Sequence, residues 1–173
     1  MGSGRLIVPF VPSPDLVVRR MLTLAEIKAN EVVYDLGAGD GRILSSAVLN
    51  FGAKAIGVEL HPSRYQEILE RLESEQIRDS ASVIRGDFHD VALVDADVVT
   101  LYLLTSVNTE IRPKLERELK AGSRVVSHDF PIRGWLPTSV ERVRDRCTTH
   151  EIYVYKVPYS IPSRMSDQTT LLR

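Results

Sequence analysis

The chain has few of the features that mark several common classes of protein. Among its 173 residues there is one cysteine, Cys147, and one tryptophan, and aromatic residues make up 6% of the sequence. A single cysteine excludes an internal disulfide and is typical of a reducing compartment, so we expect a cytoplasmic protein. No apolar run reaches the roughly 18 residues of a membrane-spanning helix, and the polar first residues do not form a signal peptide. A net charge of −1 gives no overall attraction to nucleic acid or to an anionic membrane.

The order of apolar runs and turn residues predicts a single α/β domain. The predicted strands are 32–36, 54–59, 81–85, 97–103 and 123–127, and the predicted helices are 15–28, 41–51, 62–75 and 109–119. Alternating residues in 139–145 and 151–157 predict a closing antiparallel hairpin. Together these elements make a Rossmann-like, mostly parallel sheet of seven strands with helices on both faces. We expect the domain to span 1–158, with an extended segment and helix at 5–29, and residues 159–173 to form a flexible tail.

The most informative stretch is Val32–Arg42, where an apolar run ends on Asp35 and glycines follow at alternate positions. This pattern predicts a buried strand, a tight turn and a helix start, at the edge of a doubly wound sheet where ligands bind. A dinucleotide fingerprint would place its third glycine one residue later, where Arg42 stands. Asp35 and Asp40 flank the turn, and carboxylates repel phosphate and attract cations. The turn therefore favours S-adenosylmethionine (SAM), which carries an ammonium and a sulfonium but no phosphate; an ordinary glycine turn is the plainer alternative.

Two further acids end the next two predicted strands. Glu59 follows Asp35 by about twenty residues, the position from which a carboxylate can accept both hydroxyl protons of a ribose. Asp87 can accept a hydrogen bond from the adenine amino group, and Phe88 can lie beside the base. Either acid alone could simply start a loop, but three acids at successive strand ends predict a SAM site. With their neighbours, the predicted cofactor-binding residues are Tyr34, Asp35, Leu36, Gly37, Gly39, Asp40, Gly41, Glu59, Leu60, Gly86, Asp87, Phe88 and Tyr102.

The stretch Val32–Arg42 resembles the first motif of class I SAM-dependent methyltransferases. Together with the acid-ended strands, Val8–Pro14, Leu101–Asn108 and Arg112–Leu119 resemble the small broad-specificity protein-lysine methyltransferases of archaea and their mitochondrial relatives. Lys114–Pro131 is also similar to the catalytic core of the non-SET histone lysine methyltransferases. Those enzymes carry an Asn-Asn-Phe run at the end of the strand that corresponds to 97–103, where this sequence has Tyr102-Leu103-Leu104. The resemblance covers about residues 5–158. It implies SAM as methyl donor, S-adenosylhomocysteine as product, protein lysine as substrate, and closure of Pro12 and Ser13 over SAM.

Several motifs that other methyltransferases use are absent from this sequence, and their absence limits which kind of atom can accept the methyl group. The loop after the predicted strand 97–103 lacks the Asn/Asp-Pro-Pro-aromatic sequence that many methyltransferases of base or amide amino groups carry there. Cys147 falls in the predicted hairpin, which argues against carbon-5 methylation through a cysteine nucleophile. The four histidines show no ligand spacing, so no metal is expected. A lysine ε-amine fits what remains, because in-line methyl transfer needs alignment, and an apolar channel keeps the amine neutral.

The ends of strands four and five supply the predicted catalytic residues. Tyr102 is expected to line the lysine channel with its hydroxyl near the amine, although it could instead be an ordinary core aromatic. His128 and Asp129 are expected to orient the amine or to accept its proton through water. The predicted channel wall consists of Leu103, Phe130, Pro131 and Trp135; for Trp135 a place in the core is the alternative.

The absence of a large insertion between the strands predicts an open cleft with broad specificity for proteins that present exposed lysines. We expect a monomer, and automethylation is plausible. A class I methyltransferase for RNA or a small metabolite is the alternative enzyme, supported only by Arg142, Arg144 and Arg146 on one strand face, so nucleic acid is not the expected partner. A SAM-sensing or nucleotide-binding module without catalysis is the alternative outside the enzymes.

Overall fold

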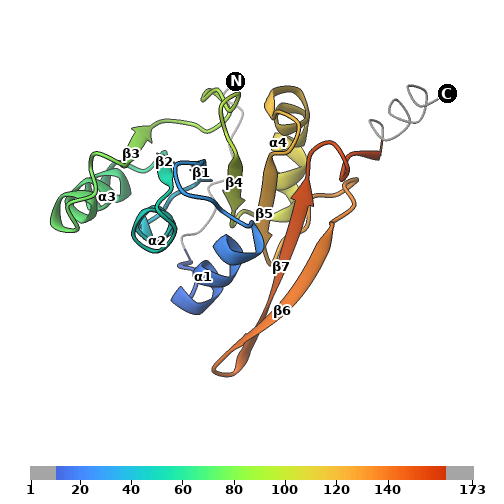
Figure 1. Ribbon diagram of the computed structural model, residues 1–173, viewed down its shortest axis with the longest axis horizontal. Coiled ribbons are helices and arrows are strands. Elements are labelled where there is room, and N and C mark those ends of the chain that lie inside the picture. Colours follow the sequence, from blue (N-terminus) through green and yellow to red (C-terminus); the bar gives the residue numbers. More distant parts are fainter. Residues whose placement is uncertain (1–10, 163–173) are drawn as a thin grey trace, which may run out of the picture.

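The computed structural model describes residues 11–162 as one sheet covered by helices (Figure 1). The helices are α1 (Asp15–Leu24), α2 (Arg42–Phe51), α3 (Pro62–Ser74) and α4 (Thr105–Glu118). The strands are β1 (Val32–Leu36), β2 (Lys54–Glu59), β3 (Ala81–Arg85), β4 (Val98–Leu101), β5 (Arg124–His128), β6 (Ser139–Asp145) and β7 (Thr148–Lys156). Their order in the 7-stranded sheet is β3-β2-β1-β4-β5-β7-β6. The first five strands are parallel and β7 is antiparallel to both neighbours, so the predicted fold class is confirmed.

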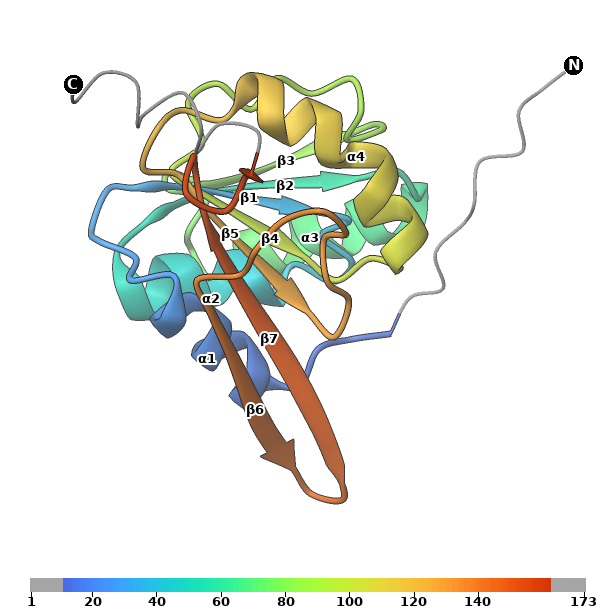
Figure 2. The same cartoon turned by 90° about the vertical axis from the view of Figure 1, so that its right-hand side faces the viewer.

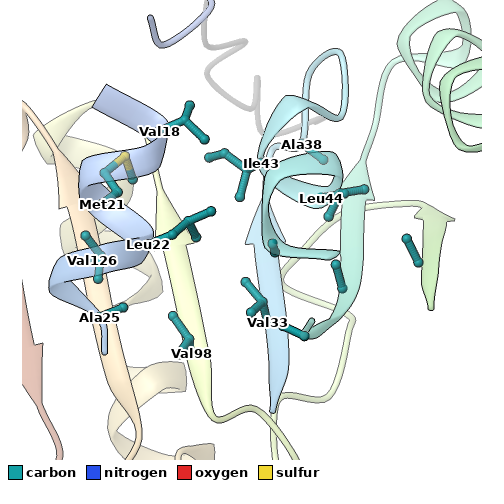
Figure 3. Packing of buried hydrophobic residues seen from close by; sticks show 14 of the residues in the cluster. Val18, Met21, Leu22, Ala25, Val33, Ala38, Ile43, Leu44, Val98 and Val126 are labelled. Atoms are coloured by element: carbon teal, nitrogen blue, oxygen red, sulfur yellow. The ribbon is translucent and has the colours of Figure 1, made fainter. Parts of the chain in front are cut away.

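Helices α1, α2 and α3 lie on one face of the sheet and α4 lies on the other (Figure 2). On the first face, α1 buries Val18, Met21 and Leu22 at helical spacing against the strands. Val33 and Val126, from β1 and β5, lie beneath these helices (Figure 3). Both faces of the central strands are therefore covered, which explains why these strands are nearly continuous in apolar residues.

Helix α4 is longer than the sequence pattern predicted. It begins at Thr105 rather than at 109, and it contains Pro113. Val107, Ile111 and Leu115 recur every fourth residue and are all buried against the sheet. This apolar stripe extends the helix toward its N-terminus, and its burial outweighs the hydrogen bond that a proline in the helix cannot donate. Residues 102–104 are therefore the whole connection between β4 and α4.

The C-terminal hairpin is also more extensive than predicted. Strand β7 begins at Thr148 rather than at 151, and His150 pairs with Val143 of β6. Cys147 lies exposed in the short turn between the two strands. The hairpin extends beyond the rest of the sheet (Figure 2).

The boundary of the predicted C-terminal tail needs a correction. Ser160 and Ile161 are 0% and 1% exposed, and the Ser160 carbonyl accepts the amide hydrogen of Leu136 at 2.9 Å. These residues are part of the packed domain, because they cover the end of the core beside β7. The predicted segment 5–10 and residues 163–173 lie outside the described residues. Within residues 11–162, no helix combines the length and the apolar character that crossing a membrane requires.

Candidate active site

A cavity of about 610 Å³ lies at the carboxyl ends of β1, β2 and β4. Its size suits a small-molecule cofactor, and its position is the one where open α/β sheets bind ligands. The predicted residues that line it are Pro12, Ser13, Asp35, Gly37, Gly39, Asp40, Glu59, Leu60, Asp87, Phe88, Tyr102 and Leu103. Residues without a sequence prediction also line it, and these include Val11 of the N-terminal segment, Arg42 of α2, His61 just before α3, and Val107 of α4.

The glycine turn between β1 and α2 forms the floor of the cavity. Gly37, Gly39 and Gly41 have φ angles of 82°, 58° and 79°, in the left-handed region that favours glycine. The amides of Gly37 and Ala38 both donate to the carbonyl of Val58, at 2.9 and 3.0 Å. The turn is therefore fixed to the end of β2, and residues 37–40 of the turn line the cavity.

Asp35 is 3% exposed at the end of β1 and lines the cavity. The Thr100 hydroxyl donates to its Oδ1 atom at 2.7 Å. Burial raises the pKa of Asp35 to about 7, and the carboxylates of Glu59 and Asp40 also act to raise it, against the hydrogen bond from Thr100. A cation placed in the cavity would supply the opposite charge that this buried carboxyl lacks. Thr100 was not predicted from the sequence, because its role depends on the pairing of β1 with β4.

Glu59 joins the glycine turn to the start of α3. Its Oε2 atom accepts the amide hydrogen of Gly39 at 2.8 Å, and its Oε1 atom accepts that of His61, also at 2.8 Å. A carboxylate has about four acceptor positions, so two hydrogen bonds leave it able to accept hydroxyl protons from a ligand. Asp87 similarly accepts the amide hydrogen of His89 at 2.8 Å at the other end of the cavity.

Asp40 differs from the other acids because positive side chains surround it. Its Oδ2 atom lies 2.7 Å from Arg42 Nη2 and 3.3 Å from Arg71 Nη2. Burial by itself would raise the pKa of Asp40, but hydrogen bonding to Arg42 and the charge of Arg71 lower it overall. Arg42 and Arg71 therefore neutralise the negative charge of Asp40 without a ligand. Arg42 also donates to the Ser13 carbonyl at 2.7 Å, which holds the N-terminal segment against the turn.

The structure places other predicted cofactor-binding residues away from the cavity. Tyr34 and Leu36 are buried in the core on the α4 side of the sheet. Gly41 precedes α2 and Gly86 donates its amide hydrogen to the Glu59 carbonyl at 3.0 Å, so both act in turns beside the cavity. Strand alternation explains Tyr34 and Leu36, since their side chains point to the face opposite that of Asp35.

Most of the residues predicted to form the channel wall lie outside the lining of this cavity. Trp135 is 4% exposed in the core, where its Nε1 atom donates to Glu116 and its ring meets Tyr155 edge-on. Phe130 and Pro131 do not line the cavity either, although the ring of Phe130 lies 6.0 Å from that of Tyr102. Leu103 is the predicted wall residue that does line it.

Tyr102 lies between the cavity and His128, the last residue of β5. Its ring stacks on His128 with centroids 3.8 Å apart, and neither His128 nor Asp129 lines the cavity. His128 is 0% exposed, and its Nδ1 atom is hydrogen-bonded to the Ser13 hydroxyl at 2.8 Å. Burial, opposed by the charge of Asp129 and assisted by His150, lowers the pKa of His128 to about 4. From the sequence, His128 was expected to orient the amine or to accept its proton through water; the structure places its ring outside the cavity lining, behind Tyr102.

The sheet order and the acid-lined cavity at its carboxyl edge define a class I SAM-dependent methyltransferase. A protein from Saccharolobus islandicus named protein-lysine N-methyltransferase is 48% identical over 151 residues, which are 87% of this chain and 94% of that protein. The adenine nucleotide translocase lysine N-methyltransferase of Mus musculus is 38% identical over 79% of this chain and 59% of its own length. A crystal structure of an RNA methyltransferase from Salinibacter ruber with S-adenosylhomocysteine matches with 38% identity and a TM-score of 0.81, covering 88% of this chain and 97% of that one.

The ANTKMT methyltransferase domain family matches residues 35–139, and this chain belongs to that family. The predicted resemblance, enzyme class and cofactor are confirmed: the protein is a SAM-dependent methyltransferase related to protein-lysine N-methyltransferases.

Proposed function

We propose that this enzyme transfers the methyl group of SAM to the ε-amines of lysines in a broad range of proteins. The observation that supports this most directly is the 48% identity to a protein-lysine N-methyltransferase across almost all of that protein. The cavity supports the same reaction, because it combines acids for the cofactor with an apolar wall for the acceptor.

The three acids are suited to successive parts of SAM. The buried carboxyl of Asp35 would pair with the ammonium group, and this pairing would restore its ionised form. Glu59 would accept the ribose hydroxyl protons while it holds Gly39, and Asp87 would accept from the adenine amino group. Pro12 and Ser13, held by Arg42, would cover the cofactor.

The lysine amine would reach the methyl group beside Tyr102 and Leu103. Methyl transfer from a sulfonium is an in-line displacement in which the amine lone pair forms the new bond and the thioether leaves. Burial, with a smaller effect of Asp129, raises the pKa of Tyr102, so its hydroxyl stays neutral and can accept a hydrogen bond from the amine. The apolar side chains of Leu103 and Val107 would disfavour the charged ammonium and so favour loss of its proton to water. This transfer itself needs no metal.

For His128 and Asp129 we propose an indirect role. His128 contacts both Tyr102 and Ser13, so it can fix the positions of a channel residue and of the covering segment. The monomeric state and the cytoplasmic location stay predictions.

RNA is the alternative substrate, because the Salinibacter ruber structure carries the name of an RNA methyltransferase. In the structure, two of the three arginines that favoured RNA bond to other groups of the same hairpin. Arg142 forms an ion pair with Glu151 at 3.0 Å, and Arg144 donates to the Arg146 carbonyl.

Labelled SAM and a panel of unrelated proteins distinguish these functions. We expect label on lysines of several proteins, identified by mass spectrometry, unchanged by ribonuclease and lost with Asp35→Asn. Label confined to one protein would contradict broad specificity. Label only in RNA, removed by ribonuclease, would overturn the assignment to lysine.

A further inference from the structure

Three possible ligand atoms converge where β5 ends beside β7. His128 Nε2 lies 2.9 Å from His150 Nδ1, and Asp129 Oδ2 lies 3.2 Å from each of these nitrogens. The antiparallel pairing of the two strands produces this triangle, because His128 is opposite Ile152, two residues from His150. The three residues are separated in sequence, so no spacing motif announces them.

The dimensions of the triangle match those of a transition-metal site. Zinc bonds of about 2.0–2.1 Å place neighbouring ligands about 2.8–3.4 Å apart, with the shorter separations in octahedral and the longer ones in tetrahedral geometry. The three edges of 2.9, 3.2 and 3.2 Å fall in this range. Two imidazoles and one carboxylate are also a common ligand set for zinc and other late first-row ions.

The surroundings of the triangle orient the ligands as outer-shell partners do. The Ser13 hydroxyl is hydrogen-bonded to His128 Nδ1 at 2.8 Å, so Nε2 can point its lone pair into the triangle. The amide of Glu151 donates to Asp129 Oδ1 at 2.8 Å, and the amide of Asp129 donates to the Glu151 carbonyl at 2.7 Å. His128 and Asp129 therefore each have their other polar side-chain atom held in place.

Burial and backbone strain add to the case. His128 and His150 are 0% and 8% exposed. The side chain of Asp129 is 28% exposed, so an ion can reach the triangle from solvent on that side. Asp129 has a φ of 59°, a left-handed conformation that is uncommon for a residue other than glycine. Such strain tends to occur at functional sites, where the surrounding structure maintains it.

We propose that His128 Nε2, His150 Nδ1 and Asp129 Oδ2 bind one divalent transition-metal ion of the zinc class, with water completing its coordination. The ion would join the end of β5 to β7 behind Tyr102 and, through His128 and Ser13, would fix the N-terminal segment over the cavity. The proposal replaces the sequence-based expectation of no metal. It does not depend on which substrate the enzyme methylates.

Cobalt titration of tag-free, chelator-treated, full-length protein tests this site. We expect one Co²⁺ per chain with visible absorption bands, which Zn²⁺ displaces. His150→Ala should lower the affinity by more than about 100-fold, because loss of a ligand exceeds the effect of losing an outer-shell partner. Asp145→Asn removes a carboxylate from the same hairpin and should leave the affinity unchanged.

X-ray absorption at the zinc edge gives a test that needs no variant. Imidazole scattering and nitrogen or oxygen neighbours at about 2.0–2.1 Å are expected. Any of three results would overturn the proposal: no stoichiometric metal binding, a His150→Ala variant that binds Co²⁺ as tightly as the wild type, or a zinc spectrum without imidazole scattering. The contact between the two histidines would then be a hydrogen bond that shares one proton. If His150→Ala does not fold, Asp129→Asn replaces it in the titration.

Discussion

Glu59 accepts the amide hydrogen of Gly39, so the acid at the end of β2 fixes the glycine turn at the end of β1. The same carboxylate accepts the amide hydrogen of His61 at the start of α3. One side chain thus shapes the cavity before any cofactor binds, and the residue proposed to hold the ribose also organises the turn beneath the cofactor.

Replacement of Glu59 should separate these two contributions. Glu59→Ala removes charge-assisted hydrogen bonds worth roughly 1.5–3 kcal/mol, so SAM affinity should fall about 10- to 150-fold and the melting temperature should also fall. Glu59→Gln keeps one carbonyl acceptor and a similar shape, so it should lose affinity with a smaller change in melting temperature. Calorimetry with SAM and thermal unfolding measure the two effects; identical losses in both variants would argue against a structural role.

The pH dependence of SAM binding should follow Asp35. Its pKa is raised to about 7 without cofactor, and the ionised form binds the ammonium group, so binding below pH 7 must first release a proton. Affinity should therefore be about 20- to 30-fold weaker at pH 5.5 than at pH 7.5. Asp35→Asn should bind weakly at both values, with little pH dependence. A wild-type affinity that does not change over this range would show that Asp35 is not the partner of the ammonium.

Asp35 also links pH to the stability of the cofactor-free enzyme. Its folded pKa of about 7 exceeds the ordinary value of 3.8, so the folded chain retains a proton that the unfolded chain releases. The contribution of this group to stability should be greatest below about pH 4 and should decline as the pH rises to about 7. Urea unfolding of the wild type and of Asp35→Asn at several pH values isolates this contribution of Asp35. Saturating SAM should reduce the difference at neutral pH.

Tyr102→Phe tests the chemistry at the end of the cavity. Loss of the hydroxyl should lower kcat several-fold and leave SAM affinity within about twofold, because the ring and its stacking on His128 remain. Calorimetry and steady-state kinetics with a lysine-containing protein give the two quantities. If neither changes, Tyr102 is not beside the amine.

Gly57 should resist substitution for a reason that lies in packing. A Cβ atom at this position would lie 2.8 Å from Leu44 Cδ1 and 2.9 Å from Ala38 Cβ, between α2 and the glycine turn. Gly57→Ala should therefore destabilise the protein by about 1–3 kcal/mol in denaturant unfolding. Gly86→Ala is the matched control, since nothing lies within 4 Å of the atom that it adds. Equal stability of the two variants would contradict this packing argument.

The sheet, the glycine turn and the acids at the strand ends could all be predicted from the order of residues alone. These features depend on local physical rules: apolar periodicity, the φ angles open to glycine, and the meeting of carboxyl ends at one edge of a parallel sheet. Asp35, Glu59 and Asp87 consequently line one cavity, although they are far apart in the chain.

The neighbours of these groups, in contrast, depend on how the folded chain packs. The sequence could not place Trp135 in the core or pair Asp40 with Arg42 and Arg71, because long-range packing fixes side-chain partners. The start of α4 and the buried Ser160 and Ile161 likewise depend on contacts with the sheet. The meeting of His128, Asp129 and His150 depends on the register between β5 and β7, since a shift of one residue would turn each side chain to the opposite face.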